Sequence, residues 1–440
     1  MSTENSEKAS SAAAATTAPA KRPAKRNRRN RRKWVTWSIV IASILVASCA
    51  VLSQVGLWRT RVAIEARQNS AASGWLSVAG WCWPRNAEWY FLSAVINRRA
   101  ENFDAVEDNL KKSHSLGWPV SDLEREQLIA MAQTGQFRGV GNKWGELFQT
   151  AGSDGPEICK AYVNYALGRF RLDEAAAVLK GWKSDFPADP SPHVMEGKIN
   201  IVLTQWDRAE QSFRRALEID PMINEARLQL ANCLIEQLEF TEAEQQLRAV
   251  SADFRASPDV IAALAKCVAQ HGELDEALQL LNDGTQSHPA SMLLLGELGR
   301  LLLMRGENEA AAAALALVME KTPANTEIRY ALAQALRNSG DEESAQRHFL
   351  LVDEGTKAIR TLPTLQSIIT ANPEDLETRF QMASITWKWK SRRDGAAWLQ
   401  SILESDPNHQ PAHRLLADHY EELGDAGRRE FHKRMSGVAE

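Results

Sequence analysis

The chain has 440 residues, of which 44% are hydrophobic and 25% are charged, a composition that is ordinary for a folded protein. The net charge of −4 hides a division, because residues 1–33 carry +8 and the remaining residues therefore carry −12. The acidic body would repel phosphates, which argues against a nucleic-acid partner, and a basic tail on an acidic body indicates that the two parts meet different surroundings.

The first 33 residues are expected to form a disordered cytoplasmic tail. Beyond Met1, residues 1–20 contain no large apolar side chain and therefore cannot build a core. The run Lys21–Lys33 that follows is strongly basic. Beside a membrane, each such charge adds about 1 kcal/mol of attraction to an anionic surface, so this run is suited to anionic lipid.

Residues 34–58 are predicted to cross a membrane once. They contain no charge, and at about 1.5 Å per residue they span about 37 Å, more than a hydrocarbon core of about 30 Å. Trp34, Trp37 and Trp58 lie at the two ends, where indole rings favour the membrane interface. Because the basic residues are concentrated before this segment, we expect the N-terminus in the cytoplasm and the rest of the chain outside it, in the periplasm if the protein is bacterial.

Two other fates of this segment stay open. Val46–Cys49 reads VASC and resembles the lipobox of bacterial lipoproteins, which would make Cys49 a lipidated first residue. A cleaved signal peptide would instead need a shorter apolar core and a cut at a small residue. The apolar run continues nine residues past Cys49, so a retained anchor is the favoured interpretation.

A period of 34 residues governs the middle of the chain, with units that begin at residues 156, 190, 224, 258, 292 and 326. Two stretches in each unit have apolar residues three and four apart, which predicts two amphipathic helices. Glycine at position 15 separates them in three units, and proline at position 32 ends most second helices. One such hairpin cannot bury its apolar face, so the units are expected to stack.

Small residues at positions 8 and 20 are expected to let the two helices of a unit approach closely. Leucine or phenylalanine at position 24 should fill the groove towards the next unit. The predicted packing residues are Ala175, Ala209, Gly197, Ala243, Ala277, Gly299, Ala311 and Ala345.

Over residues 156–352 these columns resemble the tetratricopeptide repeat, whose consensus is W-x2-L-G-x2-Y, then A-x3-F, then P. The resemblance implies an all-α solenoid of antiparallel helix hairpins that binds proteins or peptides. The tryptophan position departs from the consensus, and it holds Cys159, His193, Arg227, Ile261, Leu295 and Arg329. The departure weakens the prediction of individual contacts but leaves the predicted fold unchanged.

Further helical units are expected outside this block. Residues 59–155 are interpreted as degenerate repeats rich in tryptophan, with these side chains serving as core anchors rather than as a site for an aromatic ligand. Residues 353–375 are expected to form an inserted linker or helix, and residues 376–440 to form repeat-like units and a cap.

No sequence motif for nucleotide binding, a hydrolase elbow or a zinc protease occurs, so we predict no enzyme activity, no cofactor and no metal. The cysteines of neighbouring units are interpreted as buried apolar residues, because adjacent helices lie too far apart for a disulfide. The two cysteines are Cys233 and Cys267. We interpret the C-terminal histidines as solvated surface residues, and these are His409, His413, His419 and His432.

The resemblance further implies that positions 2, 5, 9 and 12 of the first helices line a concave face. We call the polar set on this face the ladder: Lys160, Asn164, Lys198, Asn232, Lys266, Arg300 and Gln334. Lys160 and Asn164 match the first pair of a carboxylate clamp, whereas Met195 and Glu225 depart from it, so a complete clamp is not expected. We expect the ladder to meet acidic or amide groups of an extended segment, with an ordinary solvated helix face as the alternative.

Together these features predict a membrane-anchored scaffold or assembly factor that binds other proteins. The tether would raise the local concentration of partners at the membrane, so modest affinities would suffice. An envelope assembly factor anchored as a lipoprotein, an RNA-binding helical repeat protein and an enzyme with an unrecognised site are the alternatives.

Overall fold

The computed structural model describes residues 27–82 and 84–437, and over these ranges the chain is helical with no strand. Most of the predicted tail lies outside the described residues. The prediction of disorder is wrong for its last residues, because α1 already begins at Asn27. Lysine and arginine are good helix formers, so the apolar helix propagates back into the basic run.

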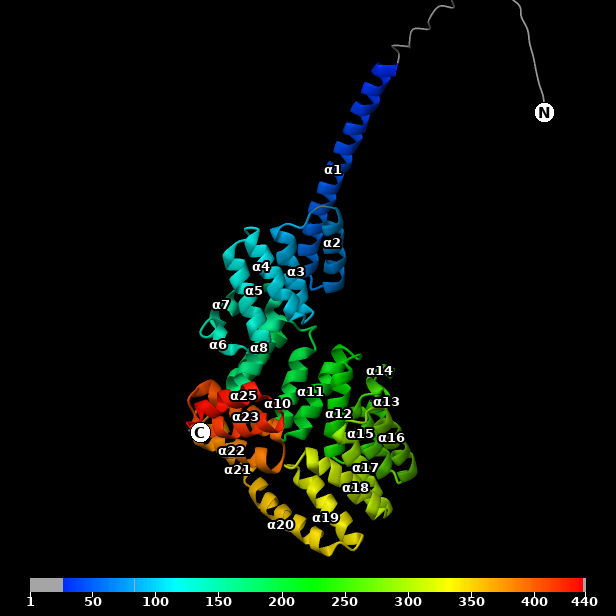
Figure 1. Ribbon diagram of the computed structural model, residues 1–440, viewed down its shortest axis with the longest axis vertical. Coiled ribbons are helices and arrows are strands. Elements are labelled where there is room, and N and C mark those ends of the chain that lie inside the picture. The colour runs from blue at the N-terminus through cyan, green and yellow to red at the C-terminus, as the bar shows by residue number, and fades with distance from the viewer. Residues whose placement is uncertain (1–26, 83, 438–440) are drawn as a thin grey trace, which may run out of the picture.

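The N-terminal third consists of antiparallel hairpins that lie beside a long projecting helix (Figure 1). Its helices are α1 (Asn27–Glu65), α2 (Asn69–Cys82), α3 (Ala87–Arg99), α4 (Phe103–Ser115), α5 (Val120–Gln133), α6 (Phe137–Val140), α7 (Trp144–Gln149) and the short 3-10 helix η1 (Gly152–Asp154).

Helix α1 runs without a break from the projecting segment into the first hairpin. Its Lys33–Glu65 portion is the one described helix that is long and apolar enough to cross a membrane, and the mean hydropathy of its 18-residue apolar window is 2.3. Side chains from Lys33 to Leu52 are largely exposed, whereas Ser53, Leu57 and Thr60 are buried against the hairpin. The predicted membrane segment ends at Trp58, within the part of α1 that packs in the hairpin, and the Trp58 side chain lies on the exposed face of α1 there.

The α1–α2 crossing is close because the contact residues are small. A Cβ atom built on Gly56 would lie 2.9 Å from the Cβ of Ala79 and 3.1 Å from the carbonyl oxygen of Trp75. The two helices therefore cross with residue 56 level with residues 75–79, and they run antiparallel from there.

A buried ion cluster joins these hairpins to the first regular unit. The Arg98 side chain is fully buried and donates hydrogen bonds to Glu126 of α5, to Asp154 of η1 at 2.6 Å and to Gln133 at 3.2 Å. Arg99 and Arg125 also donate to Asp154, at 2.9 and 3.0 Å. Burial alone would raise the pKa of Asp154, but the charges of Arg98 and Arg99 outweigh burial and hold that pKa below its usual range.

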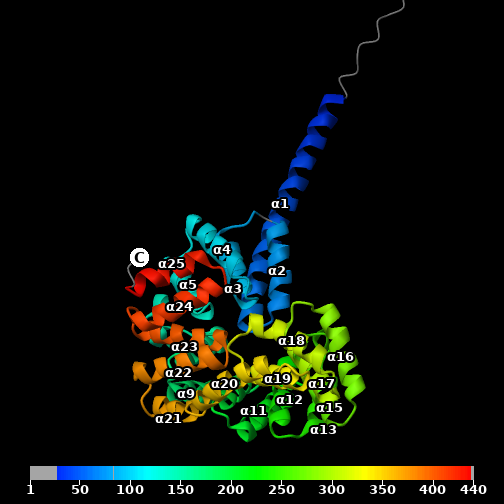
Figure 2. The same cartoon turned by 60° about the horizontal axis from the view of Figure 1, so that its bottom comes forward.

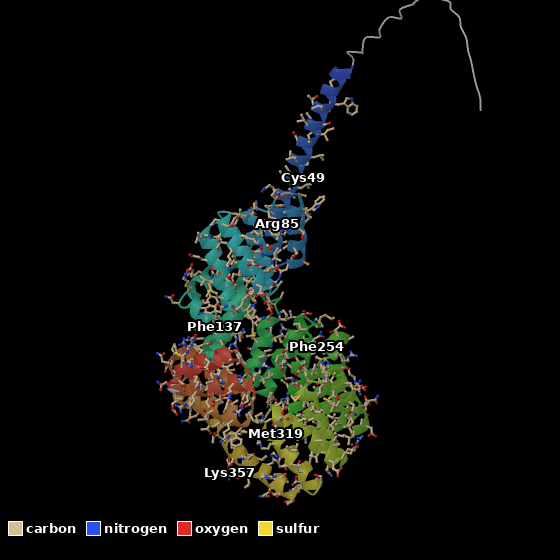
Figure 3. The ribbon with its side chains drawn as sticks, viewed as in Figure 1. Cys49, Arg85, Phe137, Phe254, Met319 and Lys357 are labelled. Atoms are coloured by element: carbon tan, nitrogen blue, oxygen red, sulfur yellow. The ribbon has the colours of Figure 1, made fainter. Side chains whose placement is uncertain are left out.

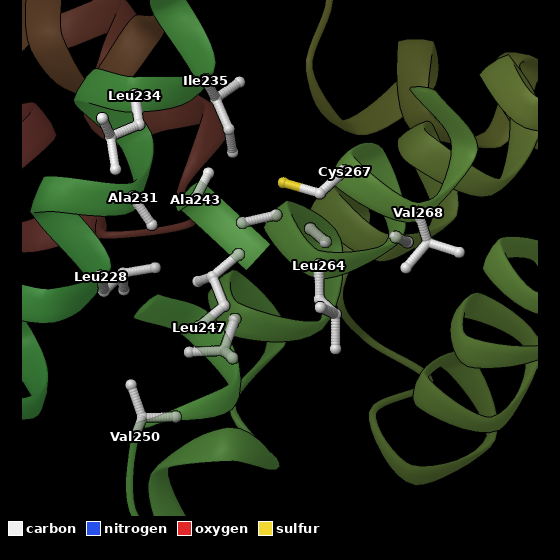
Figure 4. Close-up of a cluster of buried hydrophobic side chains, with 14 of the residues drawn as sticks. Leu228, Ala231, Leu234, Ile235, Ala243, Leu247, Val250, Leu264, Cys267 and Val268 are labelled. Carbon is white, nitrogen blue, oxygen red and sulfur yellow. The ribbon is translucent and has the colours of Figure 1, made fainter. Parts of the chain in front are cut away.

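The middle of the chain is a stack of helix hairpins with the predicted 34-residue step. The paired helices are α8 (Gly155–Gly168), α9 (Leu172–Asp185), α10 (Ser191–Val202), α11 (Trp206–Ile219), α12 (Asn224–Glu236), α13 (Phe240–Arg248), α15 (Pro258–Gln270), α16 (Leu274–Ser287), α17 (Met292–Arg305), α18 (Asn308–Lys321), α19 (Thr326–Asn338) and α20 (Glu342–Ile359), with the short α14 (Ala252–Arg255) inserted before α15. One continuous hydrophobic core extends from α11 to α17, so each unit shares its core with the next (Figure 4).

The position-20 alanines are all fully buried, from Ala175 to Ala345. The glycines at position 8 also make room for the large residue at position 24, and at Gly299 a Cβ atom would lie 3.5 Å from the carbonyl oxygen of Ala311, the position-20 residue of that unit. A Cβ atom on Gly197 would lie 2.6 Å from the Phe213 ring, and one on Gly299 would lie 2.7 Å from Leu315. In these two units the large residue at position 24 therefore packs onto position 8 of its own unit, because the glycine leaves space that an alanine would fill.

The C-terminal helices return to the start of the regular array. They are α21 (Leu362–Ala371), α22 (Leu376–Trp389), α23 (Arg392–Ser405), α24 (Gln410–Glu422) and α25 (Ala426–Met435). Figure 2 shows α21–α23 lying along α9 and the neighbouring first units. Ile369 and Met382 are buried there in one cluster with Phe170, about 200 residues earlier in the chain.

Polar contacts support the same closure. Gln366 donates a 2.9 Å hydrogen bond to the carbonyl oxygen of Val202, and Arg171 forms a 2.9 Å ion pair with Glu374. Arg379, which is fully buried, donates to the carbonyl oxygen of Arg169. The array is therefore closed into a ring of hairpins rather than left open at its C-terminal end.

The interpretation of the C-terminal histidines as solvated is wrong for two of them. His413 and His432 are buried, with their Nδ1 atoms 2.8 Å apart, and His413 Nε2 lies 2.9 Å from the carbonyl oxygen of Pro407. His413 must donate from Nε2 to that oxygen, so its Nδ1 accepts from His432. Burial, together with the neighbouring His413 and Arg428, lowers the pKa of His432 to about 4.

Candidate partner-binding groove

The ladder residues lie on the first helix of successive units. Lys160 and Asn164 lie on α8, and the others follow one to a helix along α10, α12, α15, α17 and α19. Their side chains are exposed or half-buried, whereas the adjacent position-8 residues are buried. Each first helix therefore presents position 9 to the outside of the core, as the repeat pattern predicted.

Ion pairs between units partly neutralise the basic ladder residues. Lys198 lies 3.4 Å from Glu225, which is position 2 of the next unit, and Arg300 lies 3.9 Å from Glu327 in the same relation. Exposed pairs of this kind stabilise a protein by about 0–1 kcal/mol. An acidic group on a partner can therefore replace Glu225 or Glu327 at little energetic cost.

A pocket of about 650 Å³ lies between α17, α19 and α20. Arg300 and Gln334 lie at its edge, and Arg360 contributes a second cation from beyond the end of α20. Met304 and Tyr330, which also line the pocket, are exposed by 58% and 46%. Exposed apolar side chains beside two guanidinium groups suit an apolar side chain that carries a carboxylate or amide next to it.

Comparison with known proteins gives the repeat type. A family model described as tetratricopeptide repeat matches residues 204–267 and 239–295. The chain contains tetratricopeptide repeats. No curated protein matches the chain.

Several solved structures are similar to this chain. The Thermus thermophilus protein TTC0263, a thermophilic TPR protein, is 23% identical, with 44% of this chain and 98% of that chain covered and a TM-score of 0.33. PilW, a type IV pilus biogenesis factor, is 17% identical over 45% of this chain and 93% of its own, with a TM-score of 0.40. An IFIT1 monomeric mutant with Gppp-AAAA is 15% identical over 80% of this chain and 90% of its own, with a TM-score of 0.41. At these identities and scores the similarities carry no argument about partners.

The structure does not gather the whole ladder into one site. Lys160 lies apart from the α17 pocket, in a second cavity of about 490 Å³ that also has Arg67, Trp182 and Asp189 in its lining, and it pairs with Glu101 at 3.4 Å. Asn164, Lys198, Asn232 and Lys266 line neither cavity. The ladder residues therefore do not line one continuous clamp.

Sequence reasoning missed part of the α17 pocket. Tyr330 is at position 5 of its unit, which the family resemblance had already placed on the concave face, so its exposure could have been foreseen. Arg360 lies in the segment that interrupts the 34-residue step, and no repeat column predicts its direction. The pocket depends on α20 continuing to Ile359, beyond the last predicted regular position at residue 352.

The buried cysteines are not suited to chemistry. Burial raises the pKa of the Cys233 and Cys267 thiols to about 12, so neither is a thiolate at neutral pH. Both are free. Among the residues that the structure describes, no group of three or more His, Cys, Asp or Glu side chains is arranged to hold a metal ion.

Proposed function

We propose that this protein is a membrane-anchored scaffold that holds partner proteins against its ring of tetratricopeptide repeats. The proposal has two parts, an anchor formed by α1 and a binding surface formed by the concave face. The anchor is supported by the projecting, apolar part of α1, whose side chains from Lys33 to Leu52 are largely exposed. From Trp34 to Leu52 this part is about 27 Å long, close to the thickness of a hydrocarbon core.

In this proposal the basic tail stays in the cytoplasm and the repeats lie outside it, in the periplasm of a bacterial cell. The asymmetry of basic residues around α1 supports this orientation. Residues 21–33 would then lie at the inner surface, where anionic lipid attracts them.

The observation that carries the binding proposal is the pocket between α17, α19 and α20. Its cations, Arg300 and Arg360, and its exposed apolar residues, Met304 and Tyr330, provide both contacts that an extended peptide segment needs. We expect a partner segment with an apolar side chain next to an acidic or amide group, continued along the ladder towards α15.

Charge reversal on the ladder tests this proposal. Lys198, Lys266 and Arg300 are changed together to Glu in the full-length protein, and bound proteins are cross-linked in the native membrane, captured and quantified. The matched control changes three exposed basic residues of second helices to Glu, namely Arg215, Lys321 and Arg347. We expect the ladder variant to retain less than about a tenth of the partner that the control retains, because a loss of 1.4 kcal/mol already weakens binding tenfold. Equal capture by the two variants would refute the groove.

An unanchored version of the protein needs a boundary that respects the first hairpin. Deletion of residues 1–58 would remove Ser53, Gly56 and Leu57, which pack against α2. A version that begins at Ala50 keeps them, so a change in partner capture would then report on anchoring rather than on a damaged fold.

One structural observation supports the lipoprotein alternative. Cys49 lies on the projecting part of α1, four residues before its packed portion begins (Figure 3). Cleavage before Cys49 would therefore leave the α1–α2 hairpin whole and place a lipid next to it. The intact mass of the mature protein separates the two anchors, because the lipoprotein would lack residues 1–48 and carry acyl chains.

A further inference from the structure

Three tryptophans that the sequence assigns to the core or to the end of the anchor lie on the surface of the first hairpin. Trp58 is 55% exposed, Trp75 is 39% exposed and Trp81 is 88% exposed, whereas Trp144, further along the chain, is buried. The interpretation of the tryptophans after residue 58 as core anchors is therefore wrong for Trp75 and Trp81. A large indole ring that is left in water requires another explanation.

Helix α2 has the composition of a membrane-contacting helix. It contains no charged residue over Asn69–Cys82, although it lies at the surface of the protein. Its exposed Trp75, Val78 and Trp81 recur three residues apart, and its buried Leu76 and Ala79 face the hairpin. On its outer side, α2 therefore presents apolar side chains next to the small, uncharged Ser70, Ser73 and Ser77, and its packed side is apolar.

The depth at which the exposed indole rings of α2 would lie in a bilayer follows from the level at which α1 and α2 cross. Gly56 is level with residues 75–79 of the antiparallel α2, so Trp81 is level with about residue 53 of α1. About nineteen residues separate Trp34 from residue 53, a rise of about 29 Å. A bilayer whose inner boundary is at Trp34 would thus have its outer hydrocarbon boundary, about 30 Å away, at the level of Trp81.

The remaining aromatic and basic groups lie further out, at headgroup depth. Trp58 is about one helical turn beyond that boundary. The Arg59 guanidinium lies 5.2 Å from the Trp58 ring and 5.7 Å from the Trp75 ring, which places the three groups together on one face. Arg85, exposed just after α2, lies at the same end of the hairpin (Figure 3). Indole rings with neighbouring arginines are the groups that favour the phosphate region of a bilayer.

We infer that the C-terminal end of α2 is a second membrane-contact site, which inserts Trp81 and Val78 into the outer interface of the bilayer that α1 crosses. This inference rests on the proposed anchor. The occupant is phospholipid rather than protein, because the apolar face of α2 continues directly from the lipid-length part of α1. Two helices in the interface fix the orientation of the repeat ring, which a single helix would leave free to rotate about its axis.

Site-specific photo-crosslinking in the full-length protein tests this contact. Benzoyl-phenylalanine is placed singly at position 81, at position 46 in the middle of the anchor, or at position 317, where Leu317 is 56% exposed on α18. Each protein is reconstituted into vesicles of phosphatidylethanolamine and phosphatidylglycerol and irradiated. The readout is the mass shift of one attached phospholipid.

We expect lipid adducts at positions 46 and 81 in similar yield and none at position 317. Adducts at position 46 without adducts at position 81 would overturn the inference and leave the anchor intact. Absence of lipid adducts at position 46 would overturn the anchor itself. Protein adducts at position 81 would also overturn the inference, because they would place a second copy against α2. Since Trp81 is almost fully exposed, its replacement does not disturb the core.

Discussion

Replacement of Arg98 by methionine should destabilise the joint between the N-terminal hairpins and the repeat ring. The Arg98 side chain is fully buried and bonds to Glu126, Gln133 and Asp154. Removal of one partner of a buried ion pair costs about 3–5 kcal/mol, because the other charge stays in the interior without compensation. Asp154 keeps Arg99 and Arg125, so the uncompensated charge is that of Glu126, which already has one oxygen without a hydrogen-bond partner.

The assay is thermal unfolding of the full-length protein in detergent, followed by circular dichroism and by hydrogen exchange in α3 and α5. A loss of about 4 kcal/mol corresponds to a fall in Tm of about 8–16 °C for a cooperative unit of about 150–250 residues. The double variant R98M/E126L should lose less than R98M, because it leaves no buried charge unpaired. Arg215→Ala, which breaks a pair exposed by 61% on each side, should leave Tm unchanged. The reasoning is wrong if R98M behaves like R215A, or if the double variant is less stable than R98M.

Three further perturbations test other parts of the fold. Gly197→Ala should lower stability by about 1–3 kcal/mol, since its Cβ would meet the Phe213 ring at 2.6 Å. Gly181→Ala should instead raise stability by about 0.5–1 kcal/mol, because Gly181 lies in the interior of α9 with open space around it. Equal Tm shifts of the two variants in thermal unfolding would contradict this packing. Ile369→Ala removes a fully buried side chain from the ring closure and should cost about 2–5 kcal/mol, with faster hydrogen exchange in α21 and α22 before the rest of the ring; uniform exchange would mean that no separate closure exists. Because the pKa of His432 is lowered to about 4 from an unfolded value of about 6.5, the unfolded chain binds the extra proton first, and stability should fall by up to about 3 kcal/mol as pH drops through this interval. His432→Gln should flatten that pH dependence in unfolding experiments, and an unchanged slope would assign it to other groups.

The repeated part of the fold could be predicted because its determinants are local. Each hairpin places an alanine at position 20, and Ala209, Ala243 and Ala277 are all fully buried as expected. The same packing contact recurs in every unit, so the same residue type recurs at the same position of the repeat. The all-α fold class follows from those columns and from the helical spacing between them.

The closure of the ring could not be predicted in the same way. Ile369 and Met382 look like ordinary core positions of amphipathic helices, and the sequence around them does not indicate that they contact Phe170. A contact that occurs once, between residues about 200 apart in the chain, produces no repeated pattern in the sequence. The same applies to His413 and His432, whose pairing depends on how α24 and α25 pack rather than on their spacing in the chain.

The candidate site was predicted only in outline. The position-9 side chains are exposed or half-buried, and Arg300 and Gln334 line a pocket. Its depth comes from α20 and Arg360, which belong to the interruption in the repeat and therefore lie outside any column. The tryptophans at the first hairpin were misjudged because residue type alone does not distinguish a ring in a core from a ring at a surface.

Closure of the ring restricts how the number of hairpins can change in evolution. An open solenoid tolerates the gain or loss of a hairpin, because each unit touches only its neighbours. Here Gln366 and Glu374 must meet Val202 and Arg171 across the ring. Duplication of a unit between them would shift these contacts by a whole hairpin, so the length of the array is held fixed by its two joined ends.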